Sequence, residues 1–191
     1  MTSGGVARRA LATGLLLGVM ALCQGCITTT VGTDTASPAC ADRVLDLRQP
    51  PTRAGLEMRD GRAWTSWACD KGFQSRIHLP GGKSTTMLSR LVAVDSYGAA
   101  EPDTGEPTGI DVHSTALSID AGASLAGQVA SDLGIDASEL ETWRVRAETS
   151  TTTDVIETSF MRSQVSEVLT ELRVVHHPHA DTTYVHLIMS W

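Results

Sequence analysis

Four of the six histidines lie near the end of the chain, at His176, His177, His179 and His186. Imidazole is the commonest transition-metal ligand near neutral pH, so such a group could hold zinc or a similar ion. On a β-strand, however, neighbouring side chains point to opposite faces, which leaves only His177 and His179 able to share an ion. Two ligands at an exposed turn make a weak site. We therefore expect no metal site and no cofactor.

Serine, histidine and aspartate, the residue types of a hydrolase, also occur in the middle of the chain. Ser124 resembles the serine of a nucleophile elbow, but Ala126 stands where that motif needs glycine. Gly82-Lys83-Ser84 ends like a phosphate-binding loop, but Ile77 takes the place of its first glycine. We assign no catalytic residue. A small hydrolase stays as an alternative, and it would require four side chains to meet in one cleft: Asp95, Asp111, His113 and Ser124.

The chain begins with a segment typical of export. Arg8 and Arg9 precede an apolar run from Ala10 to Leu22, and Gly25 and Cys26 follow. A helix over that run would be about 20 Å long, which is short of the ~30 Å needed to cross a bilayer core. The run is instead typical of a cleaved export signal.

This segment resembles the lipobox signal of bacterial lipoproteins, in which a small residue precedes the modified cysteine. The resemblance covers the first 26 residues only. It implies cleavage before Cys26, lipidation of Cys26 by acyl chains such as palmitate, and anchoring to the extracytoplasmic face of the cell membrane. The alternatives are an ordinary secretory signal and, for the route of export, a twin-arginine signal at Arg8 and Arg9.

Composition limits the partners of the mature protein. The full chain has 15 basic and 22 acidic residues, and removal of Arg8 and Arg9 with the signal leaves a net charge of −9. Such a charge argues against nucleic acid as a partner. Apolar residues make up 41% of the chain, enough for a folded core. The expected membrane contact is through the N-terminal lipid, and the protein or small-molecule partner is unknown.

The position of each cysteine in the chain indicates its role. Cys23 leaves with the signal and Cys26 takes the lipid, so Cys40 and Cys69 remain in an oxidising compartment. We expect a disulfide between them. Free thiols or metal ligands are the alternative, but a metal would need two further ligands that the local sequence does not supply.

Hydrophobic spacing predicts the elements of the mature domain. A short helix is allowed within 39–48, and a β-hairpin is predicted from 62–69 and 73–79 with Asp70-Lys71-Gly72 as its turn. Residues 86–95 fit a helix face or a buried strand, 96–109 an exposed acidic loop, and 110–119 a strand. A helix is predicted from Ala121 to Leu133, with Asp120 as its cap and Gly134 as its stop.

The remaining segments predict more sheet. Thr142 to Ser150 and Val155 to Arg162 are expected as strands, and the last hairpin pairs Val165 to His177 with Thr182 to Trp191. If His177 faces Thr182, then Leu172 faces Leu187 and Val174 faces Val185 on the core side. The opposite side then carries polar residues, as in a sheet that is covered on one face only.

The predicted fold class is therefore α+β, an antiparallel sheet with one or two helices packed on one face. The predicted organisation is a signal peptide at 1–25, a flexible tether at 26–38 and one domain at 39–191. The predicted function is that of an exported, membrane-anchored lipoprotein, more a binding or cell-envelope module than an enzyme. A structural spacer without a ligand is a further alternative.

Overall fold

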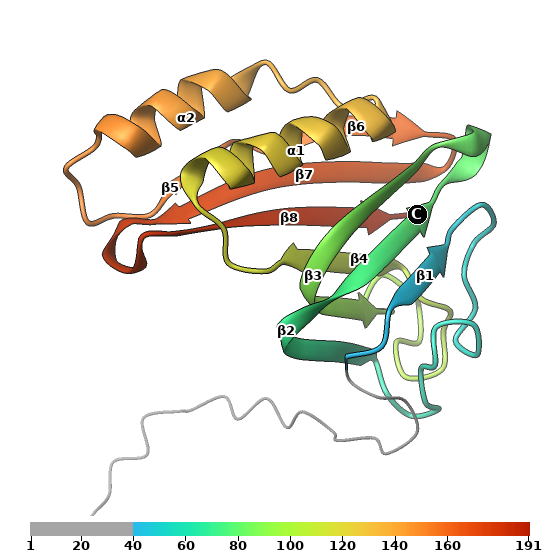
Figure 1. The fold of residues 1–191 in the computed structure, drawn as a ribbon. Coiled ribbons are helices and arrows are strands. Elements are labelled where there is room, and N and C mark those ends of the chain that lie inside the picture. The colour runs from blue at the N-terminus through green and yellow to red at the C-terminus, as the bar shows by residue number, and fades with distance from the viewer. Residues whose placement is uncertain (1–39) are drawn as a thin grey trace, which may run out of the picture. The chain divides into compact units, whose positions relative to one another are not determined.

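The structure, a computed structural model, describes residues 40–191 and shows a strongly curved sheet with two helices on one side of it (Figure 1). The predicted signal peptide, the predicted tether and Cys26 lie outside the described residues. The strands are β1 (Arg43–Asp46), β2 (Trp64–His78), β3 (Ser84–Asp95), β4 (Gly109–Ser114), β5 (Ile156–Glu157), β6 (Met161–Val165), β7 (Val168–His177) and β8 (Thr182–Ser190), and the helices are α1 (Ile119–Leu133) and α2 (Glu139–Thr149).

The strand order is β1-β2-β3-β4-β8-β7-β5, and β6 also pairs with β7. The α+β class is confirmed. The expectation of a purely antiparallel sheet is wrong, because β1 runs parallel to β2. A parallel pair needs a long crossover connection, and residues 47–63 provide it. The segment within 39–48 that could have been a helix is in fact strand β1. Leu45 in the strand and Leu47 just after it are both buried, at the two-residue spacing of a strand.

A β-bulge in β2 replaces the predicted hairpin at residues 62–79. The chain continues as one 15-residue strand through Asp70-Lys71-Gly72, and its pairing with β3 shifts between Ala68 and Phe73. Gly72 has φ +79°, and a Cβ at this position would lie 2.6 Å from the Thr115 side chain. The two halves of β2 therefore pair with β3 and not with each other. Bulges bend strands, which accounts for the curvature of the sheet here.

Helix α1 confirms the predicted helix and lies against β3, β7 and β8. Its cap is Ser118, whose hydroxyl accepts a hydrogen bond from the Ala121 amide at 3.3 Å, and not Asp120. Gly134 ends it with φ +70°, as expected of a left-handed C-terminal glycine. The preceding strand ends at Ser114, earlier than predicted, and Ile119 belongs to the helix.

Helix α2 occupies residues that were predicted as a strand, so that prediction is wrong. Trp143 and Ala147 are its buried residues, and their four-residue spacing places them on one helical face. The indole of Trp143 donates to the Ile156 carbonyl oxygen at 3.0 Å, which fixes α2 against β5. Arg144 pairs with Glu141 and Glu148 at helical spacing on the exposed side.

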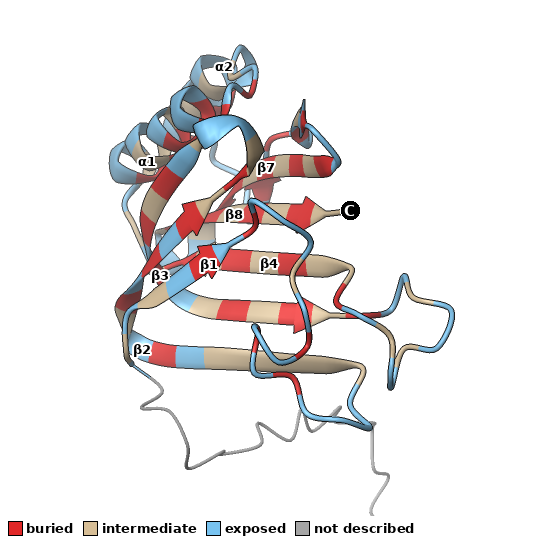
Figure 2. Ribbon diagram, turned by 90° about the vertical axis from the view of Figure 1, so that its right-hand side faces the viewer, coloured by how far each residue is buried: buried red, intermediate tan, exposed pale blue. Residues whose placement is uncertain are grey.

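The C-terminal hairpin has the predicted register, with His177 opposite Thr182, Leu172 opposite Leu187 and Val174 opposite Val185. Buried and partly exposed residues alternate along β8 and β4 (Figure 2). The buried set forms the core beneath the helices. The partly exposed set forms the outer face of the sheet, defined by Asp111, His113, Glu171, Arg173, Tyr184, His186 and Ile188.

Candidate functional site

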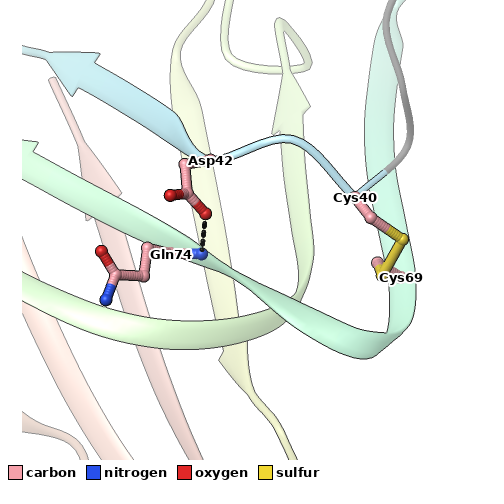
Figure 3. Close-up of a disulfide and its surroundings, with 4 residues drawn as sticks. All are labelled: Cys40, Asp42, Cys69 and Gln74. Carbon is pink, nitrogen blue, oxygen red and sulfur yellow. Dashed lines mark hydrogen bonds between the residues drawn. A yellow bond between two sulfur atoms is a disulfide. The ribbon is translucent and has the colours of Figure 1, made fainter.

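The structure contains the expected disulfide between Cys40 and Cys69 (Figure 3). The two Cα atoms are 5.2 Å apart, and Cys69 is buried in the bulge of β2. Just beyond the bond, the Asp42 carboxylate accepts a hydrogen bond from the Gln74 amide at 2.9 Å. These two links fix the position of the chain where it enters β1.

Strand β1 is at the end of the sheet and pairs with β2 only. The Leu47 amide donates to the His78 carbonyl oxygen at 2.8 Å, so odd-numbered residues of this segment direct their backbone groups toward β2. Because backbone groups alternate along a strand, those of Val44 and Asp46 point away from β2. Within residues 40–191 no hydrogen bond reaches these four N–H and C=O groups. This is a free strand edge, and Val44 is 59% exposed.

Three hollows follow one another along this edge. The first, about 210 Å³, lies between Trp67 and β1, and the second, about 560 Å³, lies between Val44 and Pro50–Pro51. The third, about 90 Å³, reaches Trp191. The first and second share Val44 and Leu56 in their walls, and the second and third share residues 48–51. We call this depression the β1 groove. Trp67 and Trp191 lie at its two ends, and its walls are residues 42–52, 55–57, 80 and 166–168.

Arg53 fixes one wall of the β1 groove. Its side chain is buried, and the guanidinium donates to the carbonyl oxygens of Gly105 at 2.8 Å and Arg62 at 2.7 Å, and also to that of Arg59. The backbone amide of Arg53 donates to the Glu106 carboxylate at 2.7 Å. The segment beside β1 is therefore bonded to the acidic loop at 96–108.

The outer face of the sheet holds a group of ionisable side chains in contact with one another. His113 and His186 are in contact across β4 and β8, with ring centroids 4.0 Å apart. A hydrogen bond of 2.8 Å joins His113 Nε2 to the Asp111 carboxylate. Burial of the His186 ring lowers its pKa to about 4, and the nearby positive charges of His113 and Arg173 act in the same direction. His186 is therefore neutral at physiological pH.

The other histidines do not converge on an ion. His176 is buried and is hydrogen-bonded to the Thr183 hydroxyl at 3.1 Å through Nδ1. His177 lies edge-on to Tyr184, and His179 is exposed in the turn. In the part of the chain that the structure describes, no group of three or more His, Cys, Asp or Glu side chains could hold a metal ion.

The four residues of the hydrolase alternative do not meet. Asp111 and His113 are together, and Asp95 lies on the same face at the end of β3, two residues beyond the partner of Asp111. Ser124 is exposed on α1. That helix packs on the Thr183 side of β8, where a Cβ on Gly122 would meet Thr183, and the outer face is the opposite side. The sheet thus separates Ser124 from His113.

Lys83 has a structural partner in place of a phosphate. Its ammonium group donates to the Leu133 carbonyl oxygen at 2.6 Å, at the C-terminus of α1, where a cation is favourable. Thr85 donates to Asp132 at 2.8 Å beside it. The Gly82-Lys83-Ser84 sequence therefore connects the β2–β3 turn to α1.

Sequence reasoning missed the β1 groove. The signal that could have found it is the spacing of Leu45 and Leu47, which alternate with the exposed Val44 and Asp46. The short helix that the sequence allowed within 39–48 concealed this alternation. The partner strand of β1 lies about 30 residues further along, as does the disulfide partner of Cys40.

Comparison with protein families, with characterised proteins and with solved structures finds no match for this chain. Among residues 40–191, neither helix is long and apolar enough to cross a membrane.

Proposed function

We propose that this protein is an exported, lipid-anchored domain that binds a partner at the extracytoplasmic face of the cell membrane. The anchoring part of the proposal rests on the sequence of residues 1–26, with its basic start, short apolar run and Gly25-Cys26. The disulfide between Cys40 and Cys69 supports it, because disulfides persist in oxidising compartments outside the cytoplasm.

The β1 groove carries the binding part of the proposal. It combines a free strand edge with neighbouring hollows of about 210 Å³ and 560 Å³, and the Arg53 hydrogen bonds hold one wall in place. A spacer has no need of such a preorganised depression. Preorganisation lowers the entropy cost of binding a ligand, so this geometry favours a binding role over a spacer.

A hydrolase is the second candidate, and the contact between Asp111 and His113 is the observation in its favour. A histidine oriented by a carboxylate can act as a general base. The nucleophile proposed from the sequence, Ser124, lies across the sheet from this pair. The binding role therefore has the stronger support.

Cell fractionation of Cys26→Ala tests the anchoring. Two or more acyl chains give stable membrane attachment at about 0.8 kcal/mol per buried CH₂, so the variant should leave the membrane fraction and appear in soluble material. Cys23→Ala, which changes a residue removed with the signal, is the matched control and should stay on the membrane. Unchanged partition of Cys26→Ala, with no acyl mass on the N-terminal peptide of the unaltered protein, would refute the proposal.

A further inference from the structure

We propose that the β1 groove binds an extended, lysine- or arginine-bearing segment of a partner protein, which joins the sheet as a strand beside β1. The inference rests on the binding role proposed above and specifies the chemistry of the partner.

A polypeptide fits this site because of the backbone groups that β1 presents. Val44 and Asp46 each direct one N–H donor and one C=O acceptor away from β2, in the alternating order of a strand edge. Sugars and acyl chains do not match that repeat. An added peptide strand does, and it takes its affinity from main-chain hydrogen bonds and its specificity from pockets beside alternate residues.

The hollows lie where the side chains of such a strand would go. Val44 and Pro50–Pro51 border the largest hollow, so an apolar side chain could be buried there. Trp67 and Trp191 border the two smaller hollows at the ends of the groove. The disulfide at Cys40 and the bond between Asp42 and Gln74 hold β1 in place before a ligand arrives (Figure 3).

The charges around the groove favour a basic ligand. The groove is lined by four carboxylates and only two guanidinium groups. Both guanidinium groups already have carboxylate partners within the groove. Arg48 Nε donates to Asp46 at 2.8 Å, and Arg43 pairs with Glu57 at 3.6 Å. The two remaining carboxylates belong to Asp42 and Glu167, which lie toward opposite ends of the groove. The net charge of −9 on the mature protein adds long-range attraction for a cationic segment.

The probe is a synthetic peptide of sequence Lys-Thr-Val-Thr-Val-Thr-Lys with blocked ends, titrated into the exported protein in mild detergent. Binding of the probe should slow hydrogen–deuterium exchange in the part of the protein that spans residues 42–57. A peptide with glutamate in place of both lysines should bind about threefold or more weakly at low salt, and the difference should shrink as salt screens the charges.

Val44→Pro is the decisive variant. Proline removes the N–H group of residue 44, which points away from β2. The pairing of β1 with β2 should therefore survive, because proline is tolerated where the N–H faces the open side of an edge strand. Affinity for the lysine peptide should fall about fivefold or more, the value of one ladder hydrogen bond and a steric block. Val44→Thr keeps the N–H group and should bind as the unaltered protein does. If Val44→Pro lowers the melting temperature of the protein, the same test can be made with the unaltered protein and a lysine peptide whose backbone N–H groups are methylated.

Three results would overturn the inference: equal affinity of Val44→Pro and Val44→Thr, equal affinity of the N-methylated and plain peptides, or protection confined to the outer face around His113. Detergent keeps the protein in solution with or without acyl chains, so failed anchoring leaves this assay unchanged. Failed peptide binding likewise leaves the Cys26→Ala fractionation unchanged.

Discussion

His113 and His186 are in contact on the outer face of the sheet, with ring centroids 4.0 Å apart, and His113 is hydrogen-bonded to Asp111. Arg173 is directly opposite His186 on β7. A proton on His186 would therefore place a positive charge in a partly buried position beside Arg173. His186 resists protonation in the folded protein, and this resistance makes the free energy of unfolding depend on pH.

The first prediction follows from the lowered pKa of His186. In the unfolded chain its ring takes a proton near pH 6.5, whereas in the folded protein burial delays this to about pH 4. As the pH falls, the unfolded state binds this proton before the folded state does. The contribution of His186 to the free energy of unfolding is therefore complete above pH 6.5 and is lost as the pH drops toward 4. A difference of one pKa unit between the two states corresponds to about 1.4 kcal/mol in the free energy of unfolding. Because the ring is partly exposed to solvent, we expect the free energy of unfolding to fall by about 1–2 kcal/mol.

Urea unfolding of His186→Gln at pH 7 and pH 4.5 measures this effect. The variant should lose less stability between the two pH values than the unaltered protein does. His179→Gln, at an exposed turn, should retain the full loss. The same pH dependence in His186→Gln and the unaltered protein would show that another group is responsible.

The second prediction concerns the disulfide. It closes a loop of about 30 residues, for which chain entropy gives roughly 3.5 kcal/mol of stabilisation. Replacement of Cys40 by serine together with Cys69→Ala, which avoids a buried hydroxyl, should lower the melting temperature by roughly 10 °C for a protein of this size. Calorimetry measures the change, and chemical reduction of the unaltered protein is the control. Free, alkylatable thiols at both positions in exported material would contradict the bond.

The third prediction concerns Arg53. Its guanidinium satisfies several loop carbonyl groups from a position that is 8% exposed. Lysine carries a single compact ammonium group on a flexible chain and cannot reproduce the planar fork of arginine. Arg53→Lys should therefore lower the free energy of unfolding by about 2–3 kcal/mol. Arg76→Lys, on the exposed side of β2, should change it by less than about 0.5 kcal/mol.

Urea unfolding compares the two lysine variants. Limited proteolysis adds a local measurement, since Arg53→Lys should speed cleavage within the acidic loop at 96–108, to which Arg53 is bonded. Equal stabilities of Arg53→Lys and Arg76→Lys would mean that the buried guanidinium contributes nothing beyond its charge.

Elements defined by local contacts were predicted well from the sequence. The register of β7 and β8 followed from placing His177 opposite Thr182, because a four-residue connection leaves few other pairings. Helix α1 was predicted from its periodic apolar face and from Gly134. The disulfide followed from the compartment and the count of cysteines, without any knowledge of the fold.

Elements defined by distant contacts were not predicted. The Asp70-Lys71-Gly72 sequence fits a turn, and only pairing with the 12-residue β3 makes it a bulge. Helix α2 was misassigned because the contact of Trp143 with Ile156 is visible only in three dimensions. The free edge of β1 depends on pairing with residues about 30 positions away. The β1 groove could not be found before that pairing was known.

The bond between Cys40 and Cys69 also determines how a mechanical load applied at the N-terminal side would pass into the domain. Tension applied from residues before Cys40 passes through the two sulfur atoms into the bulge of β2, inside the body of the sheet. It bypasses Arg43 to Asp46, whose parallel pairing with β2 would otherwise bear the pull. If the lipid anchors the domain as proposed, drag on the body of the domain would therefore leave the pairing of β1 with β2 unloaded.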